Sequence, residues 1–370
     1  MTSGFVRRAT TACVVAALVI ATASAAFGDD VPSLKDLFEG KFLVGCAVSR
    51  SGLLLNDQLI SKHFNAVTAE NSMKWESVHP WPDTYRFIEA DAIVDYAEKN
   101  GMVVIGHTLV WHQQTPSWVF TDENGREVTR EVLLERMREH IHTVVGRYKG
   151  RVRGWDVVNE AIDDSTGGLR NTHWRRIIGD DYIEWAFRFA HEADPDAELY
   201  YNDYSTTDPK KREAIYNLVK GLIDKGIRVD GIGMQGHWDI QSPSEQNIRY
   251  AIERFASLGV RVHITELDVS VFPWSDRSNK YANGLPEAVE NVHAARYAMM
   301  FRVFQDYSDV IERVTFWGIT DAGSWKNNYP VARRTDYPLL FDRQGQPKAA
   351  FWAVVNTVLD SADVVQTISQ

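Results

Sequence analysis

Two glutamates stand at the ends of apolar runs, Glu160 in WDVVNEA and Glu266 in HITELD. A carboxylate in apolar surroundings is unfavourable unless partners or a function hold it there. Either glutamate alone is compatible with a structural acid whose hydrogen bonds are satisfied. As a pair at one site, they predict glycoside hydrolysis, in which one carboxyl group protonates the leaving oxygen and the other attacks the sugar or activates water.

The neighbours of the two glutamates predict different roles for them. Asp268 follows Glu266 by two residues, and His237 ends the preceding apolar run. An imidazole held by Asp268 can donate a hydrogen bond to Glu266 and keep it ionised as a nucleophile. Glu160 has Asn159 beside it and no obvious cationic neighbour in the sequence, which suits a general acid. Asn159 is expected to reach a sugar 2-hydroxyl; the alternative is that it caps the loop after its strand.

Further polar and aromatic residues end or follow the other apolar runs. Amide, acid and imidazole groups can bind sugar hydroxyls, and flat aromatic rings pack against pyranose faces. Any one of the tryptophans could instead fill the interface between strands and helices. The predicted substrate-binding residues are Glu70, Asn71, Lys74, His107, Trp111, Gln114, Asn202, Tyr204, Gln235, Trp317 and Trp325.

A metal site is the alternative function for the two histidines at strand ends, His107 and His237. Zinc sites are marked by H-E-x-x-H or by clustered His, Asp and Cys ligands, and the sequence has neither pattern. We therefore expect no metal and no cofactor.

Eight short apolar runs alternate with amphipathic helical stretches, a pattern typical of a parallel sheet. Runs that are apolar throughout predict strands covered on both faces, as in a closed (β/α)8 TIM barrel of the α/β class. The rival is an open doubly wound sheet, which would need a Gly-rich phosphate-binding turn that is absent. The runs are KFLVGCAV, FNAVTAEN, MVVIGHTLVWH, RGWDVVNE, ELYYNDY, GIGMQGHW, RVHITELD and RVTFWGITD, and helices are expected over 130–148, 182–193, 209–225, 243–258 and 287–307. In a barrel the carboxyl ends of all strands meet at one mouth, so the candidate residues would face one another.

The first 25 residues differ from the rest of the chain. Arg7 and Arg8 precede the apolar run TACVVAALVIATA, and small residues end the segment. This pattern predicts a secretory signal peptide over 1–25 and a single catalytic barrel domain over 26–370. A membrane anchor and a twin-arginine signal are the alternatives. We expect a secreted, extracellular protein with no membrane association after cleavage.

Composition and charge narrow the range of partners. With 44% hydrophobic and 24% charged residues, the chain is typical of a globular enzyme. Loss of Arg7 and Arg8 with the signal changes the net charge from −10 to −12, which disfavours nucleic acid and anionic lipid as partners.

Of two cysteines, Cys13 leaves with the signal and Cys46 is expected in the core. We expect a monomer.

At these residues the sequence resembles the endo-β-1,4-xylanases of glycoside hydrolase family 10, from about Leu34 to Leu359. The motifs that carry the resemblance are TAENSMKWE, GHTLVWHQQTPSW, WDVVNEA, YNDY, GIGMQGHW, ITELDV, FWGITDAGSW and YPLLFD. The resemblance implies a retaining enzyme acting on xylan and xylo-oligosaccharides, with Glu160 as acid/base and Glu266 as nucleophile.

The resemblance also implies how the other residues divide the substrate. Glu70, Asn71 and Lys74 would bind the sugar on the non-reducing side. Gln114 and Trp325 would crowd the position where glucose carries its hydroxymethyl group, which xylose lacks, and so favour xylan over cellulose. The cleavage subsite would be shaped by His107, Trp111, Asn159, Gln235, His237, Trp317 and Trp325. A barrel endo-glucanase with the same two acids and a catalytically inactive lectin are the competing functions, and residues 273–286 form a loop without an assigned role.

Overall fold

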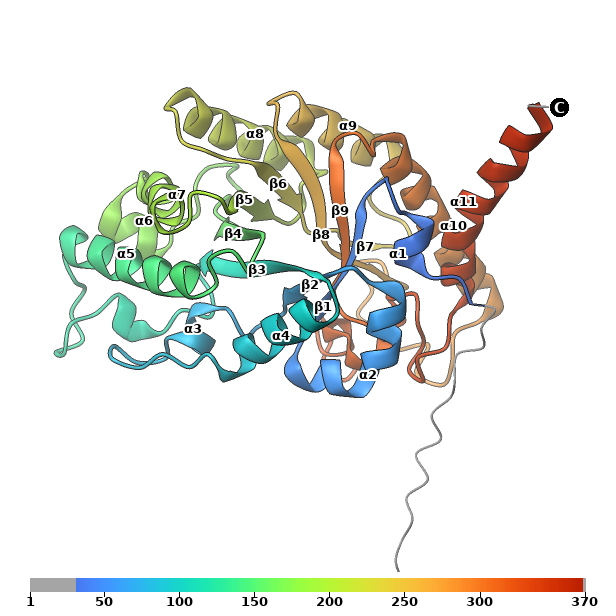
Figure 1. The fold of residues 1–370 in the computed structure, drawn as a ribbon, viewed down its shortest axis with the longest axis horizontal. Coiled ribbons are helices and arrows are strands. Elements are labelled where there is room, and N and C mark those ends of the chain that lie inside the picture. Colours follow the sequence, from blue (N-terminus) through green and yellow to red (C-terminus); the bar gives the residue numbers. More distant parts are fainter. Residues whose placement is uncertain (1–30, 369–370) are drawn as a thin grey trace, which may run out of the picture. The chain divides into compact units, whose positions relative to one another are not determined.

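Parallel strands occupy the centre of the described chain, and helices lie outside them (Figure 1). The computed structural model describes residues 31–368, with side chains up to residue 359; the predicted signal peptide and Cys13 lie outside these residues. The described residues from Ser33 onward form one compact unit. The strands are β1 (Leu43–Val48), β2 (Ala66–Ala69), β3 (Val103–Val110), β4 (Gly154–Asn159), β5 (Glu198–Asp203), β6 (Gly231–Met234), β7 (His237–Asp239), β8 (Arg261–Ser270) and β9 (Ile311–Phe316).

The strands close into a parallel barrel. Each strand from β1 to β5 pairs with the next, β9 pairs with β1, and β8 pairs with β9. The ring closes where β6 pairs with the first part of β8, Gly231 lying opposite Arg261. β7 continues the barrel position of β6, because it pairs with the later part of β8, His237 lying opposite Asp268. The predicted single-domain (β/α)8 barrel is therefore confirmed, and the open doubly wound sheet is wrong.

The strands are mostly apolar because both of their faces are covered. All residues of β2 and β4 are buried, as are all but the first of β8. One close approach depends on glycine: a Cβ on Gly106 in β3 would lie 2.1 Å from the ring of Trp155 in β4. The next residue, His107, lies opposite Asp156. Polar side chains in these strands are therefore desolvated and need partners.

Helices connect the successive strands and cover the outside of the barrel (Figure 1). The five predicted helices are present as α5, α7, α8, α9 and α10. Helix α9 begins after the expected position, because the Ser244 side chain accepts the N–H of Asn247 as an N-cap. The α-helices are α1 (Leu34–Leu37), α2 (Arg50–His63), α3 (Trp75–Val78), α4 (Ile88–Lys99), α5 (Arg130–Arg147), α6 (His173–Ile178), α7 (Tyr182–Ala193), α8 (Pro209–Asp224), α9 (Glu245–Ala256), α10 (Glu287–Asp306) and α11 (Ala349–Ile368), and three short 3-10 helices are η1 (Ser117–Val119), η2 (Asp321–Gly323) and η3 (Trp325–Asn327).

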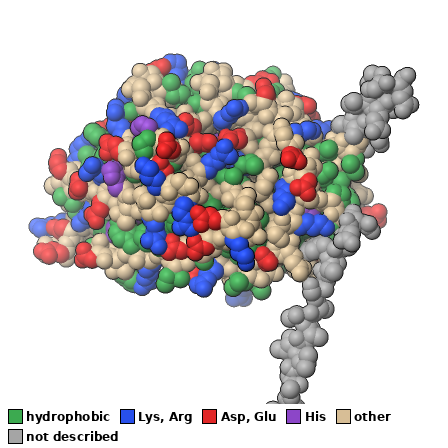
Figure 2. Space-filling view, in the orientation of Figure 1, with side chains coloured by type: hydrophobic (Ala, Val, Ile, Leu, Met, Phe, Trp, Pro, Cys, Tyr) green, Lys and Arg blue, Asp and Glu red, His purple; other side chains and the backbone are tan. Residues whose placement is uncertain are grey.

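The surface carries both signs of charge. Figure 2 shows acidic and basic side chains next to one another over one face of the chain. Pairs such as Arg147 with Asp91 at 2.6 Å connect neighbouring helices. Cys46 is a buried free thiol, as predicted. Within residues 31–368, no helix combines the length and the apolar character that a bilayer crossing requires.

Candidate active site

Glu266 lies within β8 and is only 5% exposed. Its Oε2 is 2.9 Å from Nε2 of His237, and its Oε1 accepts a hydrogen bond from Nδ2 of Asn202 at 2.8 Å. Burial opposes ionisation of Glu266, but the hydrogen bond from His237 and the nearby histidine charges outweigh it and hold the pKa below its ordinary value. Glu266 is therefore ionised, the form that a nucleophile needs.

His237 lies between two carboxylates. Its Nδ1 is 2.8 Å from Oδ2 of Asp268, on the side opposite Glu266. Burial lowers the pKa of His237, but Asp268 and Glu266 outweigh burial and raise it to about 9. The ring is consequently a cation at neutral pH and donates from both nitrogens. Asp268 also accepts from Nε1 of Trp325 at 2.7 Å and lies 3.4 Å from Nζ of Lys326.

Glu160 directly follows β4 and has different surroundings. Its Oε1 accepts from Nε2 of Gln235 at 2.9 Å and from Nδ2 of Asn159 at 3.2 Å, and its Oε2 accepts from Nε1 of Trp111 at 3.0 Å. No ion pair within 4 Å involves Glu160 among residues 31–359. The direct hydrogen-bond partners thus differ, neutral donors for Glu160 and a cationic imidazole for Glu266, an arrangement that separates an acid from a nucleophile.

Amide side chains bridge the two glutamates. Nδ2 of Asn202 donates both to Glu266 and to Oδ1 of Asn159, the latter at 3.0 Å. Asn159 in turn donates to Glu160, and Nε2 of Gln235 lies 3.3 Å from Oδ1 of Asn159. The structure therefore brings Glu160 and Glu266 to one site, although β5 and β6 separate β4 from β8 around the barrel.

Asn202, a predicted substrate-binding residue, is buried among protein partners. Its side chain is 0% exposed, and its Oδ1 accepts from Oγ1 of Thr265 at 2.7 Å. Its amide nitrogen is engaged by Glu266 and Asn159. With these side-chain polar atoms bonded to protein, Asn202 holds Glu266 in place, and its contact with substrate stays a prediction.

A cluster of polar side chains around Lys74 lies next to Trp111, which bonds Glu160. Nζ of Lys74 lies 2.9 Å from Oδ1 of Asn71 and 2.9 Å from Oε1 of Gln114, and 4.9 Å from the centre of the Trp111 ring. Burial raises the pKa of half-buried Glu70, while the charge of Lys74 opposes this shift. These five predicted residues therefore form one cluster of hydrogen-bonding groups next to the acid.

Aromatic and imidazole rings form another side of the site. The centre of the Trp317 ring lies 5.3 Å from that of His107 and 6.2 Å from that of His237, both in T-shaped arrangements, and Trp317 is 8% exposed. The Trp325 ring centre is 4.9 Å from that of His237. Nδ1 of His107 is fixed by Oδ2 of Asp156 at 2.8 Å, so this histidine has a set orientation.

Tyr204 follows β5 and lies outside the amide bridge. Its hydroxyl contacts Asp164 and accepts from Arg170 at 3.0 Å, and Nζ of Lys211 is 3.4 Å from its ring centre. Its expected contact with substrate stays a prediction.

Several supporting residues were missed by the sequence analysis. Asp156, 2% exposed, fixes His107, and Lys326, 3% exposed, faces Asp268. A signal for Asp156 was present, because it is an acid inside the same apolar run that ends at Glu160. Thr265 had no such signal, since a threonine is ordinary in a strand.

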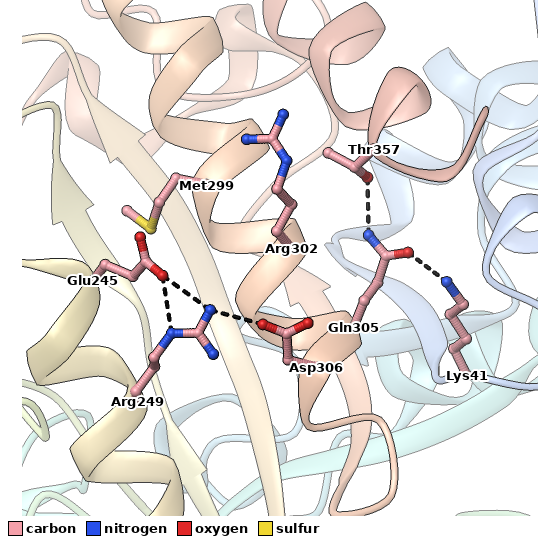
Figure 3. Close-up of a pocket in the computed structure, with 8 residues that line it drawn as sticks. All are labelled: Lys41, Glu245, Arg249, Met299, Arg302, Gln305, Asp306 and Thr357. Atoms are coloured by element: carbon pink, nitrogen blue, oxygen red, sulfur yellow. Dashed lines mark hydrogen bonds and ion pairs between the residues drawn. The ribbon is translucent and has the colours of Figure 1, made fainter. Parts of the chain in front are cut away.

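The structure also contains a pocket away from these residues, formed by α9, α10, α11 and the segment before β1. Figure 3 shows its lining side chains, in which Arg249 pairs with Glu245 and Asp306, and Gln305 contacts Lys41. Because Arg249 already pairs with Glu245 and Asp306, this pocket is a weak candidate for catalysis. Among the described residues, no three His, Cys, Asp or Glu side chains form a group that could hold a metal ion.

Comparison with known proteins places the chain among close relatives. The sequence profile described as Glycosyl hydrolase family 10 matches residues 33–357. The chain is 50% identical to "Endo-1,4-beta-xylanase B" of Paenibacillus barcinonensis, over 88% of this chain and 98% of that protein. It is 52% identical to "Endo-1,4-beta-xylanase" of Geobacillus stearothermophilus, with the same coverages. The crystal structure of xylanase XynB from Paenibacillus barcinonensis, complexed with a conduramine derivative, superposes with a TM-score of 0.86 at 49% identity, covering 88% of this chain and 99% of that one.

Proposed function

Because the chain belongs to glycosyl hydrolase family 10, we propose that this endo-1,4-β-xylanase hydrolyses internal bonds of xylan by double displacement, with a covalent intermediate on Glu266. The observation that carries the proposal is the contrast between the two glutamates. Glu266 is ionised beside cationic His237, whereas Glu160 is held by an indole and two amides. Such a contrast is what a nucleophile and an acid/base require.

In the first step, a carboxylate oxygen of Glu266 forms a bond to the anomeric carbon. The bond from that carbon to the leaving oxygen breaks, and Glu160 gives its proton to the leaving oxygen. In the second step, Glu160 takes a proton from water, the water oxygen attacks the anomeric carbon, and Glu266 leaves as a carboxylate. Two inversions at one carbon return the β configuration.

We assign the sugar 2-hydroxyl to Asn159, whose amide lies between the two glutamates. A hydrogen bond to this hydroxyl strengthens as charge develops on the sugar ring. His237 holds its positive charge beside Glu266 and favours the ionised nucleophile before attack.

Proton NMR during hydrolysis of xylopentaose tests the stereochemical course. The first product signals should be those of the β-anomer, with the α-anomer appearing later by mutarotation. Initial formation of the α-anomer would show inversion and would overturn the double displacement.

Preference for xylan over cellulose is proposed from Gln114 and Trp325. Gln114 accepts a hydrogen bond from Lys74, and Trp325 donates one to Asp268. These contacts support a position for both residues beside the two glutamates. Steric exclusion of a hydroxymethyl group predicts a higher kcat/KM on xylotetraose than on cellotetraose by about 100-fold or more. Equal values on the two sugars, or a preference for cellotetraose, would favour the endo-glucanase alternative.

Export, a monomeric state and the absence of nucleic-acid or membrane partners are also proposed. Export depends on the signal pattern of residues 1–25. N-terminal sequencing of the protein from the culture medium should begin near Ala26. An intact N-terminus on protein retained in the cell would contradict export.

Analytical ultracentrifugation of the mature chain tests the monomeric state. The measured mass should be that of one chain, and twice that mass would contradict the monomer.

A further inference from the structure

The backbone at Glu160 has a conformation that is unfavourable for any residue except glycine. Its φ of 57° lies in the left-handed region, which costs a side-chain-bearing residue roughly 1–3 kcal/mol unless the surroundings hold it. The N–H of Glu160 donates to the carbonyl of Asn202 at 2.9 Å, and its carbonyl accepts from Nε of Arg170 at 3.2 Å. These two hydrogen bonds hold the backbone N–H and the backbone carbonyl of Glu160.

The following peptide is fixed by a side chain from β5. The N–H of Ala161 donates to Oη of Tyr201 at 3.1 Å. Because a backbone N–H can only donate, the Tyr201 hydroxyl must accept here and must give its own proton elsewhere. It gives that proton to Oδ2 of Asp203, 2.5 Å away. Tyr201 is 0% exposed and Ala161 2% exposed, so water does not replace these contacts.

Asp203 connects this hydroxyl to the first turn of α8. Its Oδ1 is 2.9 Å from Nζ of Lys211, which is 2% exposed, and 2.9 Å from the N–H of Tyr204. Burial raises the pKa of Asp203 to about 6, although the charge of Lys211 opposes this shift. None of Tyr201, Asp203 and Lys211 belongs to the hydrogen-bonding shell of the Glu160 or Glu266 carboxyl groups.

We propose that Tyr201 is a positioning residue for Glu160, acting through the Ala161 peptide, and that Asp203 orients the Tyr201 hydroxyl for this purpose. The inference rests on the proposed acid/base role of Glu160. A side chain follows its backbone, so relaxation of the left-handed conformation would move the Glu160 carboxyl away from the leaving oxygen. A displacement of about 1 Å can reduce a rate about 100-fold.

The test compares kcat/KM on two substrates that differ in their need for an acid. Xylotetraose has a poor leaving group that must be protonated, whereas 2,4-dinitrophenyl β-xylobioside has a leaving group that departs without a proton. Tyr201→Phe should lower kcat/KM on xylotetraose about 10- to 100-fold and leave the value on the aryl xylobioside within about threefold. Asp203→Asn, which keeps the side-chain shape, should show the same selectivity with a smaller loss.

Tyr200→Phe is the matched control. Tyr200 is the preceding residue on β5, is 1% exposed, and bonds through its hydroxyl to Glu198, with no contact to Glu160 or Ala161. It should keep both kcat/KM values within about threefold, and thermal unfolding checks that all variants are folded. An equal loss on both substrates, or no loss on either, in folded Tyr201→Phe and Asp203→Asn would overturn the inference.

Glu160→Gln separates this inference from the proposed function. It should lose activity on xylotetraose far more than on the aryl xylobioside. If Glu160→Gln lost both alike, the acid/base role itself would fail. If Glu160→Gln were selective and Tyr201→Phe were not, only the positioning role would be overturned.

Discussion

Glu160 and Glu266 are two glutamates at one site whose direct hydrogen-bond partners differ. His237 stands beside Glu266 and carries a positive charge at neutral pH, because Asp268 and Glu266 raise its pKa to about 9. The indole and amides around Glu160 supply hydrogen bonds without charge. The division of roles therefore depends on Asp268, which does not contact Glu266 but sets the charge of the residue that does.

Replacement of Asp268 with Asn should move the basic limb of the pH profile. Without the Asp268 charge, the pKa of His237 falls from about 9, so the ring loses its positive charge at a lower pH. If the charged imidazole holds Glu266 for attack, the basic midpoint of kcat/KM should shift downward by about one pH unit or more, with about a tenfold loss at the higher pH. A pH series on xylotetraose measures this shift, and an unchanged basic midpoint would contradict the role of Asp268.

At the scale of elements, the eight apolar runs predicted the barrel because covered strands are apolar on both faces. The sequence did not predict that Gly236, with φ of 79°, separates β6 from β7 in the run GIGMQGHW. It also could not predict the burial of Asn202, whose partners lie on other strands. Strand ends identify residues near the mouth, whereas contacts between distant strands decide which of them face substrate.

Helix α8 supplies a prediction about stability. Asp208 caps this helix by accepting the N–H groups of Lys210 and Lys211 at 3.0 Å. Asp208→Ala should lower the free energy of unfolding by about 1 kcal/mol. Asp224→Ala at the other end of the helix removes only an exposed ion pair with Lys220. This substitution should change the free energy of unfolding by less than about 0.5 kcal/mol. Urea denaturation measures both, and equal effects would contradict the capping role.

At the scale of the whole molecule, the site contributes to the pH dependence of folding. The pKa of His237 is about 9 in the folded chain and 6.5 in its ordinary state. A raised pKa means that this contribution is fully present below pH 6.5 and is lost as the pH rises through about 9. The difference in unfolding free energy between wild type and His237→Gln should therefore shrink by about 1–3 kcal/mol from pH 6.5 to pH 10. Denaturation at both pH values measures the difference, and a constant value would contradict a charged His237.

The central claim is that Glu266 forms a covalent bond to the sugar, and mass spectrometry tests it most directly. A 2-deoxy-2-fluoro xylobioside with a dinitrophenyl leaving group should transfer its sugar to the enzyme and remain there, because the fluorine slows both steps whereas the activated leaving group speeds only the first. The intact mass should rise by one fluoroxylobiosyl group, and the modified peptide should carry it on Glu266. Absence of any adduct despite release of dinitrophenol, or modification of Glu160 instead, would contradict the account.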